Sequence, residues 1–353
     1  MSAKDIELTG VKEIARRANV SIGTVDRVIH DRKGVSQNTK DKINAIIKEL
    51  DYQPNIFARR LASKKQVVFA VLIPKISQET NYWEAPLLGI DQAGAEISPY
   101  GIVLQKYLYD VNDKNSFLEQ IKLIDLSLVK GVLLAPSFIE ESEQFVKKLE
   151  IRKIPYVFIN SDIQGHESLS YFGPDLYQSG YLSAHLMKYL LKKEDKILIV
   201  NISQEIDNQH HLLRKEQGFR NYFSDNKLEN VIVKIDIKHT DYTYISNSLE
   251  QVLKSNKIAA IFATNSRVST VAKYLAKTGD QHRILIGFDY TKENLAFLKE
   301  GDIDFLICQK PREQGYKGLM ALYQFVVHSK TGEKNNFMPI DIITSENCDF
   351  YIN

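Results

Sequence analysis

The sequence predicts two parts of different fold class: a small all-α unit with a short following helix, and then a two-lobed α/β domain. Apolar residues recur at helical spacing through roughly the first fifty residues. From Val67 onward, short β-branched runs alternate with helical segments, a pattern typical of parallel sheets covered by helices on both faces. At 353 residues, the chain is long enough for two or three domains.

The N-terminal pattern predicts three helices. The first covers Val11–Ala18, and Asn19 follows where a tight turn needs a positive φ, which asparagine tolerates better than most residues. Ser21 can cap the second helix with its side-chain oxygen. A third helix is expected to open at residue 37 or 38 and to end near Leu50.

These helices should pack through one apolar face. Val25 and Val28 of the second helix are expected to lie against Ala15, which must be small because the two helices cross closely. The buried stripe of the third helix is expected to consist of Ile43, Ile46, Ile47 and Leu50. The pattern therefore predicts a helix-turn-helix followed by a supporting helix.

Four blocks occur in order in this region: IARRANVSIGTVDRV, GVSQNTKDKI, LDYQPN and ARRLAS. The stretch resembles the DNA-binding headpiece of the LacI (lactose repressor) family. The resemblance implies that the second helix enters the major groove by its N-terminal end. It assigns DNA contacts to Ser21, Ile22, Gly23, Thr24, Arg27, Asn38 and Thr39. The alternative is a three-helix bundle that binds no DNA.

Two of these contacts would read bases. The guanidinium of Arg27 is expected to donate two hydrogen bonds to a guanine, and Ile22 to touch a thymine methyl group. Gly23 offers no side chain, so base reading at that step should be weak. Asp26 departs from the family pattern, which usually has a serine there. Its carboxylate would repel phosphate unless a neighbour such as Arg27 or Lys33 neutralises it.

Residues 54–65 resemble the hinge helix of the same family. Such a segment is too short to be a stable helix alone, and in the family two hinges from a dimer fold together in the minor groove. The resemblance assigns DNA contacts to Asn55, Ala58, Arg59 and Leu61, with Leu61 wedged between the central base steps. The alternative for Leu61 is an ordinary linker leucine.

The larger part of the chain contains the apolar runs VVFAVLI, IVLQKY, GVLLA, PYVFIN, ILIVN, VIVKID, AAIFA, ILIGF and FLICQ, which are predicted strands. So many strands exceed one small sheet and favour two linked lobes. About Val67 to Gln324 resembles the type I periplasmic sugar-binding proteins, whose fold LacI-family regulators carry as an effector domain. The resemblance implies a headpiece at 1–53, a hinge at 54–65 and an effector domain at 66–353, with lobe 1 at about 66–160 and 290–322 and lobe 2 at about 161–289 and 323–353.

In this fold, a ligand binds between the lobes, at the C-terminal ends of strands. The side chains that follow the predicted strands or match the family's pocket positions are Tyr82, Trp83, Ser137, Asn160, Asp175, Lys215, Asn265, Asp289 and Gln309. The two aromatic rings can stack on the apolar face of a sugar. The aspartates and amides suit the hydroxyl pairs of a neutral polyol. We therefore expect these side chains to bind the effector.

Several of these positions have a second interpretation. Trp83 can instead be a rim or core aromatic, and Asp289 can be a helix N-cap. Asp175 opens a helix in DLYQSG and is expected to be both a cap and a cleft residue. Either Lys215 or the adjacent Arg214 is expected to face the cleft as a cation.

Composition limits the remaining classes of protein. Residues 1–65 carry 14 Lys+Arg against 8 Asp+Glu, a net charge of +6, whereas the remaining residues carry −4. Such an excess suits a surface that faces phosphates, although a solvated basic segment would carry it as well. No apolar run approaches the roughly 20 residues that span a bilayer, and no signal-peptide core is present, so we expect a cytoplasmic protein.

Cysteine and histidine usage predicts no metal, cofactor or disulfide framework. Cys308 and Cys348 are the only cysteines, which fits a reducing compartment. His210 and His211 have no third ligand nearby in the sequence and are interpreted as polar loop residues. The sequence also lacks a Walker loop, a nucleophile elbow and a dinucleotide fingerprint, which argues against an enzyme.

Together these patterns predict a transcriptional regulator, by resemblance a repressor, that binds a pseudo-palindromic operator as a homodimer. A small molecule in the cleft, a sugar or sugar derivative rather than a purine, is expected to change the angle between the lobes. The alternative is a solute-binding module without DNA function, which predicts an export signal and leaves the basic N-terminal unit unexplained.

Overall fold

The computed structural model describes residues 10–29, 32–50, 52, 66–77, 81–204, 210–279 and 283–351. The chain divides into two compact units, Met1–Lys65 and Gln66–Asn353. The predicted hinge contacts Asn55, Ala58, Arg59 and Leu61 lie outside the described residues. No helix within these ranges is long and apolar enough to cross a membrane.

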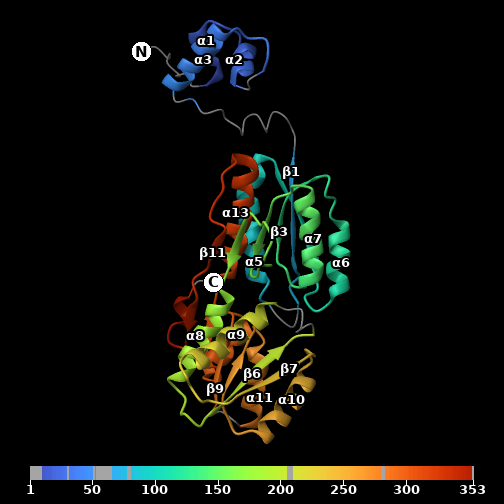
Figure 1. Ribbon diagram of the computed structural model, residues 1–353, viewed down its shortest axis with the longest axis vertical. Helices are drawn as coiled ribbons and strands as arrows, with labels where there is room; N and C mark the ends of the chain where they lie inside the picture. Colours follow the sequence, from blue (N-terminus) through green and yellow to red (C-terminus); the bar gives the residue numbers. More distant parts are fainter. Residues whose placement is uncertain are drawn as a thin grey trace, which may run out of the picture. The chain divides into compact units, whose positions relative to one another are not determined.

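The described part of the first unit contains three helices, α1 (Val11–Ala18), α2 (Ile22–Ile29) and α3 (Gln37–Glu49) (Figure 1). Asn19 ends α1 with φ 53° and ψ 50°, the left-handed conformation predicted for it. The Oγ of Ser21 accepts a hydrogen bond from the Thr24 N–H at 3.1 Å, which confirms the predicted cap.

The core of this unit forms where the apolar spacing places it. Ile14, Val25 and Ile43 are fully buried, one from each helix. Ala15 is also buried, as expected at a close helix crossing. The helix-turn-helix and its supporting helix are therefore present as predicted.

The described part of the second unit contains two sheets in which nearly all neighbouring strands run parallel (Figure 1). The sheet of lobe 1 has the strand order β11-β5-β4-β3-β1-β2, and every pairing within it is parallel. Its strands are β1 (Val67–Pro74), β2 (Ile102–Tyr109), β3 (Val129–Leu134), β4 (Tyr156–Ile159), β5 (Ser170–Gly173) and β11 (Asn335–Phe337).

The sheet of lobe 2 has the order β12-β10-β9-β8-β6-β7. Only the edge strand β12 pairs antiparallel. The strands are β6 (Lys196–Ile202), β7 (Ile232–Ile237), β8 (Ile258–Ala263), β9 (Ile284–Phe288), β10 (Phe305–Cys308) and β12 (Asp341–Ile343).

Helices cover both faces of each sheet, as the apolar strands require. One face of the lobe 1 sheet is covered by α5 (Glu84–Ile97) and α13 (Pro311–His328), and α5 continues into the short 3-10 helix η1 (Ser98–Tyr100) (Figure 1). The other face is covered by α6 (Lys114–Leu123) and α7 (Ile139–Ile151). On lobe 2 the helices are α8 (Leu176–Lys188) and α9 (His210–Asp225) on one face, and α10 (Tyr242–Ser255), α11 (Val268–Thr278) and α12 (Lys292–Glu300) on the other. The 3-10 helix η3 (Cys348–Phe350) lies near the end of the chain.

The fold class is the predicted one, but the crossings between lobes differ from the expected positions. Strand β5 pairs with β4 and belongs to lobe 1, so the first crossing comes after Gly173 rather than at about residue 160. Strand β10 pairs with β9 in lobe 2, so the second crossing comes after Cys308 rather than at about residue 290. A third crossing lies between β11 and β12 rather than at about residue 322. An apolar run predicts a strand without indicating which of two sheets it joins, and this ambiguity explains the difference.

Candidate functional site

A cavity of about 70 Å³ lies between the two lobes, at the carboxyl ends of their strands. Eight of the predicted effector contacts line it, although they are far apart in the sequence: Tyr82, Trp83, Ser137, Asn160, Lys215, Asn265, Asp289 and Gln309. They follow strands β1, β3, β4, β8, β9 and β10, except for Lys215, which lies on α9. Parallel strands deliver these side chains to one place because their carboxyl ends share one edge of each sheet.

The aromatic wall of the cavity comes from lobe 1. Tyr82 and Trp83 are nearly buried, at 9% and 5% exposure, and their rings meet edge to face with centroids 5.2 Å apart. The phenol of Tyr82 donates a 2.7 Å hydrogen bond to Asn160 Oδ1. Burial, with the nearby Asp289 carboxylate, raises the pKa of Tyr82 well above its usual value, so the phenol stays a neutral donor. The sequence interpretation of Trp83 as a wall residue agrees with its position.

Serine hydroxyls line the cavity beside this wall. The Oγ of Ser137 lies 2.6 Å from the phenol oxygen of the fully buried Tyr109. The Oγ of Ser161 donates to the Pro136 carbonyl at 3.0 Å. Ser161, which directly follows Asn160, also lines the cavity.

Lobe 2 contributes the charged groups. Lys215 is 4% exposed, and its Nζ donates to the Thr264 carbonyl at 3.2 Å and lies 3.5 Å from the centroid of the Phe288 ring. Burial lowers the pKa of Lys215 to about 8, against the opposite effect of Asp289. The cation that faces the cavity is therefore Lys215, whereas the neighbouring Arg214 packs over the Tyr177 ring.

Asp289 is the corresponding buried anion. Burial raises the pKa of its carboxyl group to about 6, and Lys215 partly opposes that rise. Its backbone has φ 75°, a conformation uncommon for aspartate, and is fixed by bonds to Ile307 and Asn294. The N-cap of α12 is Thr291, so the interpretation of Asp289 as a cap is wrong.

Two amides complete the polar lining. Asn265 Nδ2 donates to the Ile202 carbonyl at 2.8 Å, and its Oδ1 accepts from the Arg267 N–H at 3.2 Å. Gln309 is 2% exposed, and its Nε2 lies 3.5 Å from Ser179 Oγ, which is long for a hydrogen bond. The Gln309 amide therefore keeps most of its hydrogen-bonding capacity.

Asp175 is the one predicted effector contact that does not line this cavity. Its Oδ1 caps α8 by accepting from the Gln178 N–H at 3.0 Å. The cap half of the expected double role is confirmed, whereas the side chain lines a separate pocket with Tyr171 and Arg214 rather than this cavity. The DLYQSG pattern is an ordinary N-cap signature, and this signal already indicated the structural role.

Other lining residues were missed by the sequence reasoning: Val111, Asn112, Ile202, Ser203, His211, Ser266 and Arg267. His211 was interpreted as a loop residue, but α9 already begins at His210. Arg267 is 8% exposed and directly follows Asn265-Ser266, so the strand-end rule, extended by two residues, could have found it. Among the described residues, no cluster of three or more His, Cys, Asp or Glu side chains could hold a metal ion.

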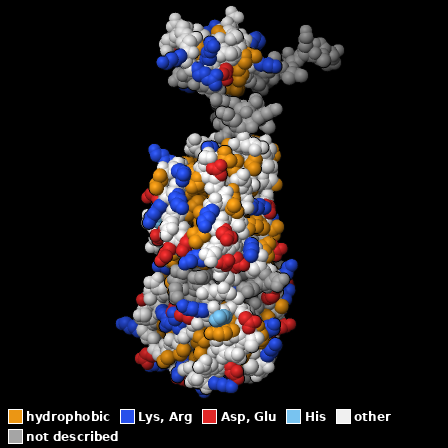
Figure 2. Space-filling model, turned by 90° about the vertical axis from the view of Figure 1, so that its right-hand side faces the viewer, with side chains coloured by type: hydrophobic (Ala, Val, Ile, Leu, Met, Phe, Trp, Pro, Cys, Tyr) orange, Lys and Arg blue, Asp and Glu red, His pale blue; other side chains and the backbone are white. Residues whose placement is uncertain are grey.

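The surface around the start of α2 is the second candidate site. Ile22 is 50% exposed, which is unusual for an isoleucine on a packed helix, and Arg27 and Asn38 are exposed. The hydroxyls of Ser21 and Thr24 lie 2.9 Å apart at the beginning of α2, and Ser36 and Thr39 form the same arrangement at α3. A Cβ at Gly23 would meet only the Ser21 hydroxyl, at 3.7 Å, so α2 has room for a side chain at this position. Lys and Arg side chains gather on the visible face of this unit (Figure 2).

The carboxylate of Asp26 has a cationic neighbour. Arg32 Nη1 lies 3.2 Å from Asp26 Oδ2, and both side chains are about half exposed. We expected Arg27 or Lys33 in this role; in the structure Arg32, from the turn after α2, pairs with Asp26. The pair reduces the negative charge that the carboxylate would present to phosphate.

Two stretches of the chain match known families. Residues 69–330 match the periplasmic binding protein domain, and residues 10–55 match the bacterial regulatory proteins of the lacI family. The chain belongs to the family of the periplasmic binding protein domain and carries a lacI-family DNA-binding domain at its N-terminus.

Named relatives agree with this assignment. The chain is 27% identical over 263 residues to the HTH-type transcriptional regulator RegA of Clostridium acetobutylicum, which covers 73% of this chain and 75% of RegA. It is 43% identical over 94 residues to catabolite control protein A of Streptococcus mutans, which covers 27% of each chain.

Solved structures share the fold of the effector domain. A protein described as a LacI transcriptional regulator from Bacteroides fragilis superposes with a TM-score of 0.77 at 29% identity, covering 82% of this chain and all of that one. GanP, a glucose-galactose binding protein from Geobacillus stearothermophilus, superposes with a TM-score of 0.71 at 20% identity, covering 80% and 99%. With a lacI-family DNA-binding domain and a periplasmic binding protein domain, the chain is a DNA-binding transcriptional regulator that is controlled by a small molecule.

Proposed function

We propose that the protein is a dimeric cytoplasmic repressor whose operator affinity is controlled by a sugar or sugar derivative. The observation that carries this proposal is the convergence of eight separate strand-end and helix side chains on one interlobe cavity in a chain with a LacI headpiece. A headpiece reads one half-site, so two copies related by a two-fold axis suit a pseudo-palindromic operator.

The chemistry of the cavity supports a polyhydroxylated effector. A sugar presents apolar C–H faces and hydroxyl edges, and the cavity offers Trp83 and Tyr82 for the first and Asp289, Asn265 and Gln309 for the second. A carboxylate accepts from hydroxyl pairs, whereas an ammonium such as Lys215 donates to ring or hydroxyl oxygens. A purine would use this mixture of donors and acceptors less completely.

Contacts between the lobes support the coupling. Asn81 of lobe 1 donates to Glu293 of lobe 2 at 3.3 Å, beside the cavity. An effector that bridges both walls changes the relative free energy of open and closed lobes, because it contacts both only when they are close. We propose that this change is passed to residues 54–65, which then favour or disfavour the DNA-bound hinge.

The test is selection of genomic DNA fragments on the purified protein, with and without a sugar panel. D-arabinose, glucose, galactose, tagatose and myo-inositol belong in the panel, because the solved neighbours are described with these or related ligands. We expect one enriched near-palindrome whose recovery changes with one class of sugar.

A Trp83→Ala variant should bind the same DNA and lose the sugar response. Sequence-independent binding would overturn the operator, and an operator that ignores every small polyol would overturn the sugar.

A further inference from the structure

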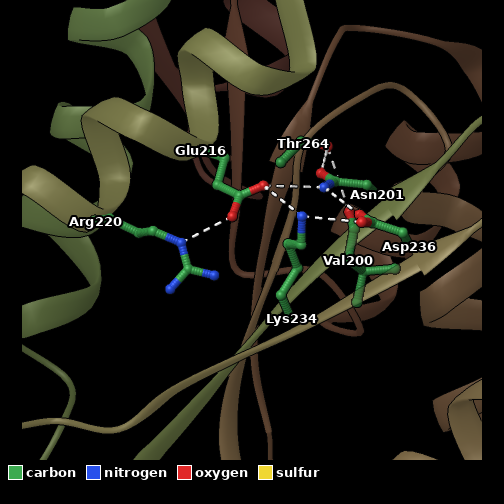
Figure 3. Close-up of polar contacts among 7 residues, drawn as sticks. All are labelled: Val200, Asn201, Glu216, Arg220, Lys234, Asp236 and Thr264. Carbon is green, nitrogen blue, oxygen red and sulfur yellow. Dashed lines mark hydrogen bonds and ion pairs between the residues drawn. The ribbon is translucent and has the colours of Figure 1, made fainter. Parts of the chain in front are cut away.

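A polar network with a buried centre and a partly exposed rim ties helix α9 to the sheet of lobe 2 (Figure 3). Asn201 on β6 lies at its centre and is fully buried. Its Nδ2 donates to Asp236 Oδ1 at 2.8 Å and to Glu216 Oε2 at 3.2 Å. Glu216 also pairs with Arg220 at 2.8 Å and with Lys234 at 3.6 Å. Two carboxylates and two cations balance each other, and only Glu216 among these four charged groups is nearly buried, at 11% side-chain exposure.

The network reaches the cavity through Thr264, which is fully buried. Its Oγ1 donates a 2.6 Å hydrogen bond to Asn201 Oδ1, and its N–H donates to the Val200 carbonyl at 3.2 Å. The carbonyl oxygen of the same threonine accepts the hydrogen bond from Lys215 Nζ. Since Thr264 follows the last residue of β8, the sheet alone restrains it weakly, and the hydroxyl contact adds a second restraint.

The hydrogen bonds form a closed circuit that includes Lys215: they lead from Lys215 to Thr264, from there to Asn201, and from there back to α9 at Glu216. Lys215 and Glu216 are adjacent on α9, so the bond from Asn201 to Glu216 anchors the helix backbone at this position. The carbonyl of Thr264 and the face of Phe288 then hold the ammonium group itself. Neither Asn201 nor Thr264 lines the cavity.

We propose that Asn201 and Thr264 are positioning residues that fix the ammonium group of Lys215 against the cavity, and so set effector affinity without touching the effector. The effect on affinity rests on the proposed function. The positioning does not, because it exists in the protein without any effector and can be measured there.

The measurement uses full-length protein with ¹³C-labelled lysine and follows the ¹H shift of the Lys215 ε-methylene, assigned by its loss in Lys215→Met. Protons above a phenylalanine face are shifted upfield by the ring current, so the wild-type signal should be set apart from those of exposed lysines. In Thr264→Val, which keeps the carbonyl but loses the hydroxyl, the signal should move downfield towards the exposed lysines. A Thr264→Val protein with an unchanged Lys215 signal overturns the proposal.

Controls separate positioning from general loss of stability. Thr264→Ser keeps the hydroxyl and should restore the wild-type shift. Tyr222→Phe removes another buried hydroxyl of lobe 2, whose oxygen lies 2.9 Å from His185 Nδ1, and should leave the Lys215 signal in place. If Thr264→Val does not fold, Thr264→Ala also removes the hydroxyl with a smaller side chain, and the Lys215 ε-methylene signal should again move downfield. Failure of the sugar panel would contradict the proposed effector and leave this shift unchanged, so the two failures are distinguishable.

Discussion

Lys215 and Asp289 face one cavity with opposite charges, and burial is the main cause of both pKa shifts. Burial lowers the pKa of the lysine to about 8 and raises the pKa of the aspartate to about 6. A buried pair that is not in direct contact is an expensive arrangement for a stable core. We propose that the pair is kept at the cavity because it binds the effector.

Replacing both charges should therefore stabilise the protein and abolish the effector response. In the double variant Lys215→Met/Asp289→Asn we expect the free energy of unfolding to rise by about 1–4 kcal/mol, the range for buried pairs replaced by neutral groups. Chemical denaturation of the full chain measures this change. Each single variant should be less stable than the double one, because it leaves one buried charge alone.

The stability that the double variant gains over wild type should depend on pH. The folded-state pKa of Asp289 is raised, so the free energy of unfolding falls as pH rises from about 4, near the unfolded value, to about 6. The folded-state pKa of Lys215 is lowered, so the free energy of unfolding rises again between about pH 8 and about pH 10. The difference between the double variant and wild type should be largest between about pH 6 and 8. A difference that is constant from pH 4 to 10 would contradict these shifts.

Arg27 gives a second test at this scale. Arg27→Ala should relax the preference for one base pair in each half-site and cost about 1–3 kcal/mol of specific binding. Binding to a set of operators with single substitutions measures the preference. Lys12→Ala, on α1, serves as a control that changes one charge without changing that base preference; an unaltered preference in Arg27→Ala would move base reading to another residue.

Single residues also show where sequence reasoning succeeded and where it stopped. Asp289 and Gln309 could be placed because each directly follows an apolar strand, and strand ends are fixed by topology. His211 could not, because it lies in the first turn of α9 and reaches the cavity through the packing of that helix, which no local pattern contains.

At the scale of elements, the crossing of α8 and α9 positions Lys215. Gly180 on α8 lies so close to α9 that a Cβ there would be 1.9 Å from the Lys215 carbonyl oxygen. Gly218 on α9 makes the reciprocal approach, with a Cβ 2.0 Å from the Tyr177 carbonyl oxygen. Both neighbours are backbone, so neither can rotate away, and the spacing of the two helices depends on the glycines.

Gly180→Ala should therefore push α9 away from α8 and displace Lys215. We expect a loss of about 1–3 kcal/mol in the free energy of unfolding, typical of overpacking, together with weaker effector response. Denaturation and operator release measure the two effects. Gly332→Ala, where a Cβ meets nothing within 4 Å, is the matched control. A Gly180→Ala protein as stable and responsive as wild type would show that the helices can separate freely.

Elements with strong periodicity were predictable, and short strands at or next to the sheet edges were not. The apolar runs of β1 and β6 indicated buried strands, and the helices of the first unit followed from their spacing and caps. The strands β5, β11 and β12 have three or four residues each, with sequences SYFG, NNF and DII, and carry no such pattern. Their pairing is decided by neighbouring strands, which explains why the lobe boundaries were misplaced.

At the scale of the whole molecule, regulation requires that the protein binds its operator more tightly than other DNA. By resemblance to the LacI family, Leu61→Ala should lower affinity for the operator while leaving salt-dependent binding to other DNA nearly intact. Titrations of both DNAs at several salt concentrations measure this. Equal losses on both would contradict a wedge role for Leu61.

The crossings between lobes also have a consequence for synthesis. Strand β11 completes the sheet of lobe 1 by pairing with β5, more than 160 positions earlier in the chain, and β12 then completes the sheet of lobe 2. The sheet of lobe 1 is therefore complete only after residue 337 has been translated, and the sheet of lobe 2 only after residue 343. The headpiece, by contrast, has all of its core residues by position 50. A nascent chain thus contains the complete helix-turn-helix unit long before it contains all strands of either sheet.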